Sequence, residues 1–142
     1  MRGLTDIVMM VGGITLLAGA VMHITGSDMS MHLYCGGTLM FAMAQLSDRY
    51  DGDNLTIRRL RGQQVLGAIF LLLSGLMMYA ERWHTEVVMN TESNDILRSF
   101  LSMLTARNGW IATMSFAAVF ELYSSVRLGR ELKKEEDNHW KL

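Results

Sequence analysis

Side chains that commonly bind metals gather at one end of the apolar segments of this 142-residue chain. They lie where one apolar segment ends or the next begins, and the set comprises His23, His32, Cys35, Glu81 and His84. Imidazole suits Zn, Cu and haem iron, while thiolate and the thioethers of nearby methionines favour Cu(I). Glu81 and His84 have the E-x-x-H spacing that di-iron bundles use twice, although it occurs once here. One interpretation is therefore a metal or haem site in a redox or carrier protein.

A competing interpretation of the same residues needs no bound cofactor. The chain has 13 methionines, and methionine fills gaps in packed interiors, so methionine near histidine is expected by chance. Histidine also has an apolar body and a polar tip, which suits the end of a membrane helix. We therefore expect no cofactor, and Cu, Zn or haem remains the alternative.

Glu121 is the one charged residue in the apolar stretch 108–126. A carboxylate within a membrane costs about 3 kcal/mol on insertion scales, and such residues usually face the bundle interior. At about 1.5 Å per helical residue, Glu121 lies about 9 Å from Arg127, in the cytoplasmic third of a membrane. Either it handles ions or protons in a small transporter subunit, or it bonds to Arg61 or Gln64 and holds two helices together. The second interpretation is favoured because depth near an interface lowers the cost.

The elements that must position these residues are four apolar segments, each close to the length of about 20 residues that spans a bilayer. Half of the residues are hydrophobic and there is no proline, which favours unbroken helices. A soluble bundle would show a charged face on each helix, and these segments lack one. We predict one all-α integral membrane domain over residues 1–142, a four-helix bundle with transmembrane helices near 5–26, 30–47, 62–81 and 108–128.

Positive charges fall on one side of this expected bundle. Ten of the 13 Lys and Arg residues precede the first segment, lie between the second and third, or follow the fourth. Lys and Arg in short loops stay in the cytoplasm, so both termini, including a tail at 129–142, are predicted to be cytoplasmic in a multi-pass inner-membrane protein. The run Ala18 to Ala20 resembles a leader cleavage site, but the apolar stretch is long for a leader and is interpreted as an anchor.

Residues 95–106, between the third and fourth segments, have an amphipathic pattern. Ile96, Leu97 and Phe100 share one face, and Arg98 lies opposite. This pattern predicts a short helix that lies on the outer membrane surface or caps the bundle. Trp83 and Trp110 flank the helix and are expected to sit at the membrane interface.

Small residues mark the faces that should pack together. Gly12, Gly19 and Gly26 recur at intervals of seven in the first segment, and His23 falls on the same stripe. In lipid, helices associate through small residues that let their backbones approach closely. We therefore expect the small and ionisable residues to face inward and the bulky ones to face lipid.

Three arginines, Arg58, Arg59 and Arg61, precede the third segment. Such a juxtamembrane patch attracts anionic lipid headgroups, at about 1 kcal/mol per cation. The same charges fix topology, which requires no further function.

The expected function is that of a non-enzymatic accessory or interaction subunit of a membrane complex. No nucleophile-elbow, phosphate-loop or zinc-protease motif occurs. The basic residues of the tail alternate with acidic ones, which argues against nucleic-acid binding. Its partners would be the lipid bilayer and either another membrane protein or a second copy of the chain. The metal or haem carrier and the Glu121 transporter subunit are the two competing hypotheses.

Overall fold

The computed structural model describes residues 2–82, 95–104 and 106–141. The chain is all-α, as predicted, since these residues form helices and no strand. Trp83 and His84 lie outside the described residues. The helices are α1 (Arg2–Ile24), α2 (Ser30–Ser47), α3 (Leu55–Glu81), α5 (Asp95–Leu104) and α6 (Gly109–Trp140).

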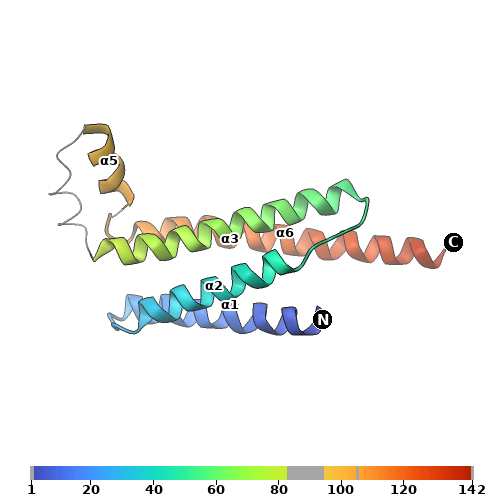
Figure 1. Ribbon diagram of the computed structural model, residues 1–142, viewed down its shortest axis with the longest axis horizontal. Helices are drawn as coiled ribbons and strands as arrows, with labels where there is room; N and C mark the ends of the chain where they lie inside the picture. Colours follow the sequence, from blue (N-terminus) through green and yellow to red (C-terminus); the bar gives the residue numbers. More distant parts are fainter. Residues whose placement is uncertain (1, 83–94, 105, 142) are drawn as a thin grey trace.

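The four long helices lie side by side as two pairs, α1 with α2 and α3 with α6, and α2 joins the pairs by packing on α3 (Figure 1). A tight turn at Gly26, whose φ of +83° favours glycine, makes α1 and α2 antiparallel. Both termini and the 48–54 loop lie at one end of the bundle, and α5 lies at the other (Figure 1). The two termini therefore lie at the same end of the bundle.

Glycines bring α1 and α2 into backbone contact. A Cβ on Gly19 would lie 2.4 Å from the backbone nitrogen of Tyr34, and one on Gly12 would lie 2.8 Å from that of Phe41. From the other helix, a Cβ on Gly37 would lie 2.4 Å from the backbone nitrogen of Leu16. The predicted glycine stripe thus faces α2 at positions 12 and 19, whereas the third glycine lies in the turn beyond α1.

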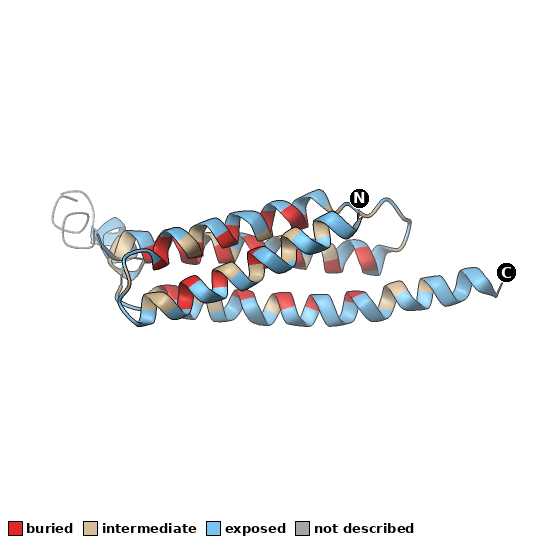
Figure 2. Ribbon diagram, turned by 90° about the horizontal axis from the view of Figure 1, so that it is seen from below, coloured by how far each residue is buried: buried red, intermediate tan, exposed pale blue. Residues whose placement is uncertain are grey.

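Bulky apolar side chains cover the outside of the bundle. Figure 2 shows buried residues on the sides where the helices face one another and exposed residues along the outward sides. The fractional exposure of Ile14 is 62%, that of Leu76 is 63% and that of Leu122 is 68%. The interior includes small and polar side chains, such as the fully buried Ser74, whose hydroxyl lies 2.5 Å from that of Tyr34.

Within the part of the chain that the structure describes, two helices are long and apolar enough to cross a membrane, over Gly3–Ile24 and Leu55–Glu81. The helix α3 begins earlier than the sequence-based bound of 62, because the Asn54 side chain accepts a hydrogen bond from the Thr56 amide and caps the helix there. The helix α6 runs through most of the predicted tail, to Trp140.

The sequence suggested that Trp110 lies exposed at the membrane interface, but the structure buries it inside the bundle. Its side chain is only 2% exposed, and its ring packs edge-on against the rings of His23, at 5.2 Å between centroids, and Tyr34, at 6.0 Å. The helix α6 begins at Gly109, and its first turn directs this ring toward the junction of the two helix pairs. By contrast, α5 leaves its apolar face open, with Ile96 85% exposed and Phe100 58% exposed.

A second, small core forms at the end that carries both termini. Ile57 and Leu60 of α3 pack with Leu128 of α6. The hydroxyl of Tyr50 donates to Oε1 of Glu135, 2.7 Å away, and ties the 48–54 loop to the extension of α6. This bond raises the pKa of Tyr50, because the neutral phenol donates to a carboxylate. The contact is therefore present at neutral pH and is lost as the pH rises through that raised pKa.

Candidate functional site

A cluster of polar side chains lies where α2, α3 and α6 meet. Nε2 of Gln45, on α2, donates to Oε2 of Glu121 at 2.6 Å. Nε2 of Gln64, on α3, donates to Oγ of Ser125 at 3.3 Å. Ser125 follows Glu121 by one helical turn, so both occupy the same side of α6. We call these four residues the polar cluster.

Gly67 makes room for the carboxylate in the polar cluster. A Cβ at this position would lie 2.6 Å from Oε1 of Glu121, closer than real side chains approach. Glu121 therefore packs directly against the backbone of α3, and its side chain is only 9% exposed. The geometry supports the prediction that Glu121 faces inward.

The bonding partners of Glu121 differ from those the sequence suggested. Glu121 bonds to Gln45, while Nη1 of Arg61 forms an ion pair with Oδ2 of Asp48 at 2.6 Å. Gln64 lies in the same cluster but bonds to Ser125. The prediction of an Arg61 or Gln64 partner was therefore wrong, because Gln45 of α2 donates to the carboxylate instead. The sequence could have indicated Gln45, because it is the one side-chain amide in the second apolar segment, residues 30–47.

Three buried oxygens of the polar cluster have no hydrogen-bond partner within the described residues. They are Oε1 of Glu121, Oε1 of Gln45 and Oε1 of Gln64. Buried polar atoms are almost always paired with protein groups or ordered water. Because all three atoms are acceptors, the cluster is suited to water, a hydrogen-bond donor or a cation.

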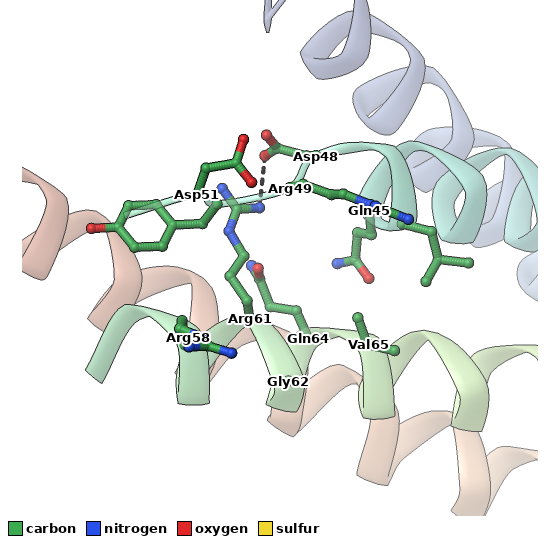
Figure 3. A pocket seen from close by; sticks show the side chains of 11 residues that line it. Gln45, Asp48, Arg49, Asp51, Arg58, Arg61, Gly62, Gln64 and Val65 are labelled. Atoms are coloured by element: carbon green, nitrogen blue, oxygen red, sulfur yellow. Dashed lines mark hydrogen bonds and ion pairs between the residues drawn. The ribbon is translucent and has the colours of Figure 1, made fainter. Parts of the chain in front are cut away.

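The first of two cavities beside this cluster lies between α2 and α3 (Figure 3), next to the 48–54 loop. This α2–α3 pocket has a volume of about 370 Å³, and Gln45 and Gln64 line its inner part. Its charged lining residues are Arg49, Arg58 and Arg61 together with Asp48 and Asp51. The lining therefore carries one more positive than negative charge. Gln45 and Gln64 belong to both the pocket lining and the polar cluster, so the pocket adjoins the cluster.

The second cavity, of about 360 Å³, lies on the other side of Glu121 and is almost wholly apolar. Its walls come from α1, α2, α3 and α6, and they include Leu16, Phe41 and Leu71. Glu121 and Ser125 are its only polar side chains among the described residues. The Gln45–Glu121 hydrogen bond therefore separates a charged pocket from an apolar one.

Two of the metal-ligand candidates at the opposite end, His23 and Cys35, contact protein groups instead of one another. Nδ1 of His23 lies 3.1 Å from Oγ of Ser30, and the Cys35 thiol faces the Gly75 carbonyl at 3.9 Å. The His32 side chain is exposed, and that of Glu81 is partly exposed. Across the described ranges no three His, Cys, Asp or Glu side chains come together in a group that could hold a metal ion. A site that includes His84 stays a prediction, since that residue lies outside these ranges.

Comparison with protein-family models, with curated proteins and with solved structures finds no match.

Proposed function

We propose that this chain is a non-enzymatic integral membrane protein that crosses the bilayer four times, through α1, α2, α3 and α6, and acts through contacts with other membrane components. The observation that carries the proposal is the outward position of its bulky apolar side chains. Soluble monomers rarely expose contiguous apolar surface beyond a few hundred Å². On α1 alone the exposed residues include Leu4, Ile7, Met10, Val11, Ile14, Leu17, Val21 and Ile24.

The dimensions of α2 and α6 suit a span, although among the described helices only α1 and α3 contain a stretch long and apolar enough to be a span by composition alone. The 18 residues of α2 at about 1.5 Å each give a length near the hydrocarbon core, which is about 30 Å thick. The one charge in the apolar part of α6, on Glu121, is turned inward, while Phe116 and Val119 face outward. Both helices therefore present apolar surface to their surroundings.

The distribution of cations supports an orientation with both termini in the cytoplasm. Arg49, Arg58 and Arg61 line a pocket at the end of the bundle that carries the termini (Figure 3). Lys and Arg near the ends of membrane helices are retained in the cytoplasm. An inner-membrane protein with this end inside is the arrangement we propose.

Labelling of single cysteines tests this topology. In a Cys35→Ser background, Asp28→Cys places a thiol in the turn between α1 and α2, and Asp53→Cys places one in the 48–54 loop. A membrane-impermeant maleimide is expected to label the first in intact cells and the second only after permeabilisation. Equal labelling in detergent controls for reactivity. Labelling of Asp53→Cys in intact cells, or release of the chain by alkaline carbonate, would contradict the proposal.

The role as an accessory or interaction subunit is supported by the exposed face of α1. This helix packs chiefly on α2, so most of its circumference is free of contact within the described residues. A photoreactive amino acid at Ile14, on this face, is expected to form a discrete adduct with a membrane-protein partner or a second copy in native membranes. The same amino acid at Lys133, on the exposed part of α6, serves as the control. Adducts with lipid alone at position 14 would overturn the interaction role.

A second candidate function is the handling of a cation or a proton, as in a small transporter subunit. The unpartnered acceptor oxygens of the polar cluster favour it, because a cation or a proton-bearing group would satisfy them. This function requires the carboxylate of Glu121, so Glu121→Gln is expected to abolish ion or proton flux in proteoliposomes while the bundle still folds.

A further inference from the structure

The α2–α3 pocket contains unsatisfied groups of both kinds. Nε of Arg61 is a buried donor without a partner among the described residues, and Oε1 of Gln45 and Oε1 of Gln64 are buried acceptors without one. Gln45 is 5% exposed and Gln64 is 7% exposed, and Figure 3 shows both amides directed into the space between α2 and α3. A ligand that satisfies all three atoms must carry both a hydrogen-bond acceptor and hydrogen-bond donors.

The charges of the pocket select an anion. Asp48 neutralises Arg61 through the 2.6 Å ion pair, but Arg49 and Arg58 have no carboxylate within ion-pair distance across the described residues. Asp51 is exposed at the rim and offsets part of this charge. Arginine binds phosphate through several N–H groups held in a fixed plane, so a phosphate group matches the outer part of the pocket.

The position of the pocket selects a lipid as the source of that phosphate. The arginines lie at the helix ends, whereas Val65 lies one turn further into the bundle than Arg61 and is partly buried. Leu46, 55% exposed on the outer side of α2, continues the apolar surface beside the opening. Basic pockets between helices on the cytoplasmic side of a membrane bind phospholipid headgroups in this way.

We propose that the α2–α3 pocket binds the phosphodiester headgroup of an anionic phospholipid that also carries hydroxyl donors, as phosphatidylglycerol does. The phosphate pairs with Arg49, Arg58 and Nε of Arg61, and the two glycerol hydroxyls donate one each to Oε1 of Gln45 and Oε1 of Gln64. The acyl chains leave the pocket past Leu46. This site rests on the proposed membrane location, and it gives the chain a lipid ligand of defined chemistry.

Defined lipids test the proposal. The purified full chain is incubated in mixed micelles with one lipid at a time, and retained lipid is measured by native mass spectrometry. Phosphatidylglycerol is expected to bind at least about 5-fold more tightly than phosphatidylmethanol, which has the same charge without a hydroxyl, since each hydrogen bond contributes about 1 kcal/mol. Phosphatidylcholine, which carries no N–H or O–H donor and no net charge, is expected to bind more weakly still. Equal retention of all three lipids would overturn the proposal.

Matched variants locate the site. Arg49→Gln and Arg58→Gln are each expected to weaken phosphatidylglycerol binding about 5-fold, from about 1 kcal/mol per cation. Arg59→Gln, on the same helix but outside this pocket, is the control and should bind as the parent does. A loss of equal size in all three variants would show that general surface charge, and not the pocket, attracts the lipid.

Another pair of variants tests the hydroxyl contact. Gln64→Leu is expected to reduce the preference for phosphatidylglycerol over phosphatidylmethanol about 5-fold, because one of the two hydroxyl contacts is lost and that to Gln45 remains. Ser125→Ala removes the Gln64–Ser125 hydrogen bond without changing the lining of the pocket, and it should keep the preference. Circular dichroism and size-exclusion chromatography of each variant confirm that it folds. A preference of unchanged size in Gln64→Leu would contradict the assignment of this contact.

Soluble compounds distinguish the source of the phosphate. Glycerol phosphate and inorganic phosphate are added to the chain in micelles that contain no phospholipid. We expect neither to stabilise the chain against thermal unfolding at concentrations where phosphatidylglycerol does. Stabilisation by glycerol phosphate of equal size would overturn the lipid assignment and identify a soluble phosphate ligand. Cysteine labelling tests the membrane topology, and lipid binding tests the pocket. The two proposals can therefore be contradicted independently.

Discussion

Alanine at position 37 is expected to separate α1 from α2 and to destabilise the bundle strongly. The added Cβ would lie 2.4 Å from the backbone nitrogen of Leu16, 2.8 Å from its Cα and 2.9 Å from the carbonyl oxygen of Gly12. All three are backbone atoms, so no side-chain rotation relieves the contact and a whole helix must move. Overpacking of this kind typically costs about 1–3 kcal/mol, and the absence of a flexible neighbour places Gly37→Ala at the upper end.

The adjacent glycine provides a matched control. Gly36 is exposed on α2, and a Cβ there would meet nothing within 4 Å. Since alanine has the higher helix propensity, Gly36→Ala is expected to stabilise the chain by about 0.5–1 kcal/mol. The two variants differ by one position and should therefore shift the thermal unfolding midpoint in detergent in opposite directions.

Gly19→Ala repeats the test from α1. Its Cβ would lie 2.4 Å from the backbone nitrogen of Tyr34 and 2.7 Å from its Cα, so a loss similar to that of Gly37→Ala is expected. If Gly37→Ala unfolds at the same temperature as Gly36→Ala, the close backbone contact of α1 and α2 is not the arrangement that the chain adopts in its membrane environment.

The sequence predicted the helical class and the inward glycine face because both depend on local periodicity. A spacing of seven residues returns Gly12 and Gly19 to one side of a helix, whichever partner lies there. The uninterrupted apolar stretches likewise indicated helices whose outer surfaces are apolar. These features need no knowledge of how one helix is rotated against the next.

The pairing of polar side chains depends on that rotation and could not be derived from the sequence. Gln45, Arg61 and Gln64 all lie at about the depth of Glu121, so the sequence offered several partners of comparable reach. The rotation of α2 about its axis places Gln45 next to the carboxylate of Glu121. Asp48, one turn further along, forms the ion pair with Arg61. The depth of a residue in the bundle follows from its position along the helix, but its hydrogen-bond partner depends on how three helices pack together.

Trp110 illustrates the same limit for an aromatic side chain. A tryptophan at the end of an apolar segment has an apolar body and a polar N–H, and it suits either a lipid interface or a helix junction. The rings of His23 and Tyr34 on the neighbouring helices decide between the two, and both lie far away in the sequence.

Replacement of Glu121 is the second substitution for which we expect a large effect, and its size should depend on the replacing residue. Glu121→Leu removes the acceptor of Gln45 and leaves that amide buried without a partner. An unsatisfied buried polar group costs about 1–3 kcal/mol, so a marked fall in the unfolding midpoint is expected. Glu121→Gln keeps the shape and a carbonyl oxygen that can accept from Gln45, so most of the stability should remain. Val119→Leu, on the outward side of α6, is the control for changes in side-chain volume.

The comparison of the two Glu121 variants also separates a structural role from ion handling. A purely structural carboxylate predicts that Glu121→Gln is close to the parent in both stability and proteoliposome flux. A carboxylate that binds a cation or carries a proton predicts a stable Glu121→Gln chain without flux, because an amide neither titrates nor holds a negative charge. If Glu121→Gln is as unstable as Glu121→Leu, the negative charge itself holds α6 in place. The unpartnered oxygens of the polar cluster would then be satisfied by a bound cation that the bundle needs for folding.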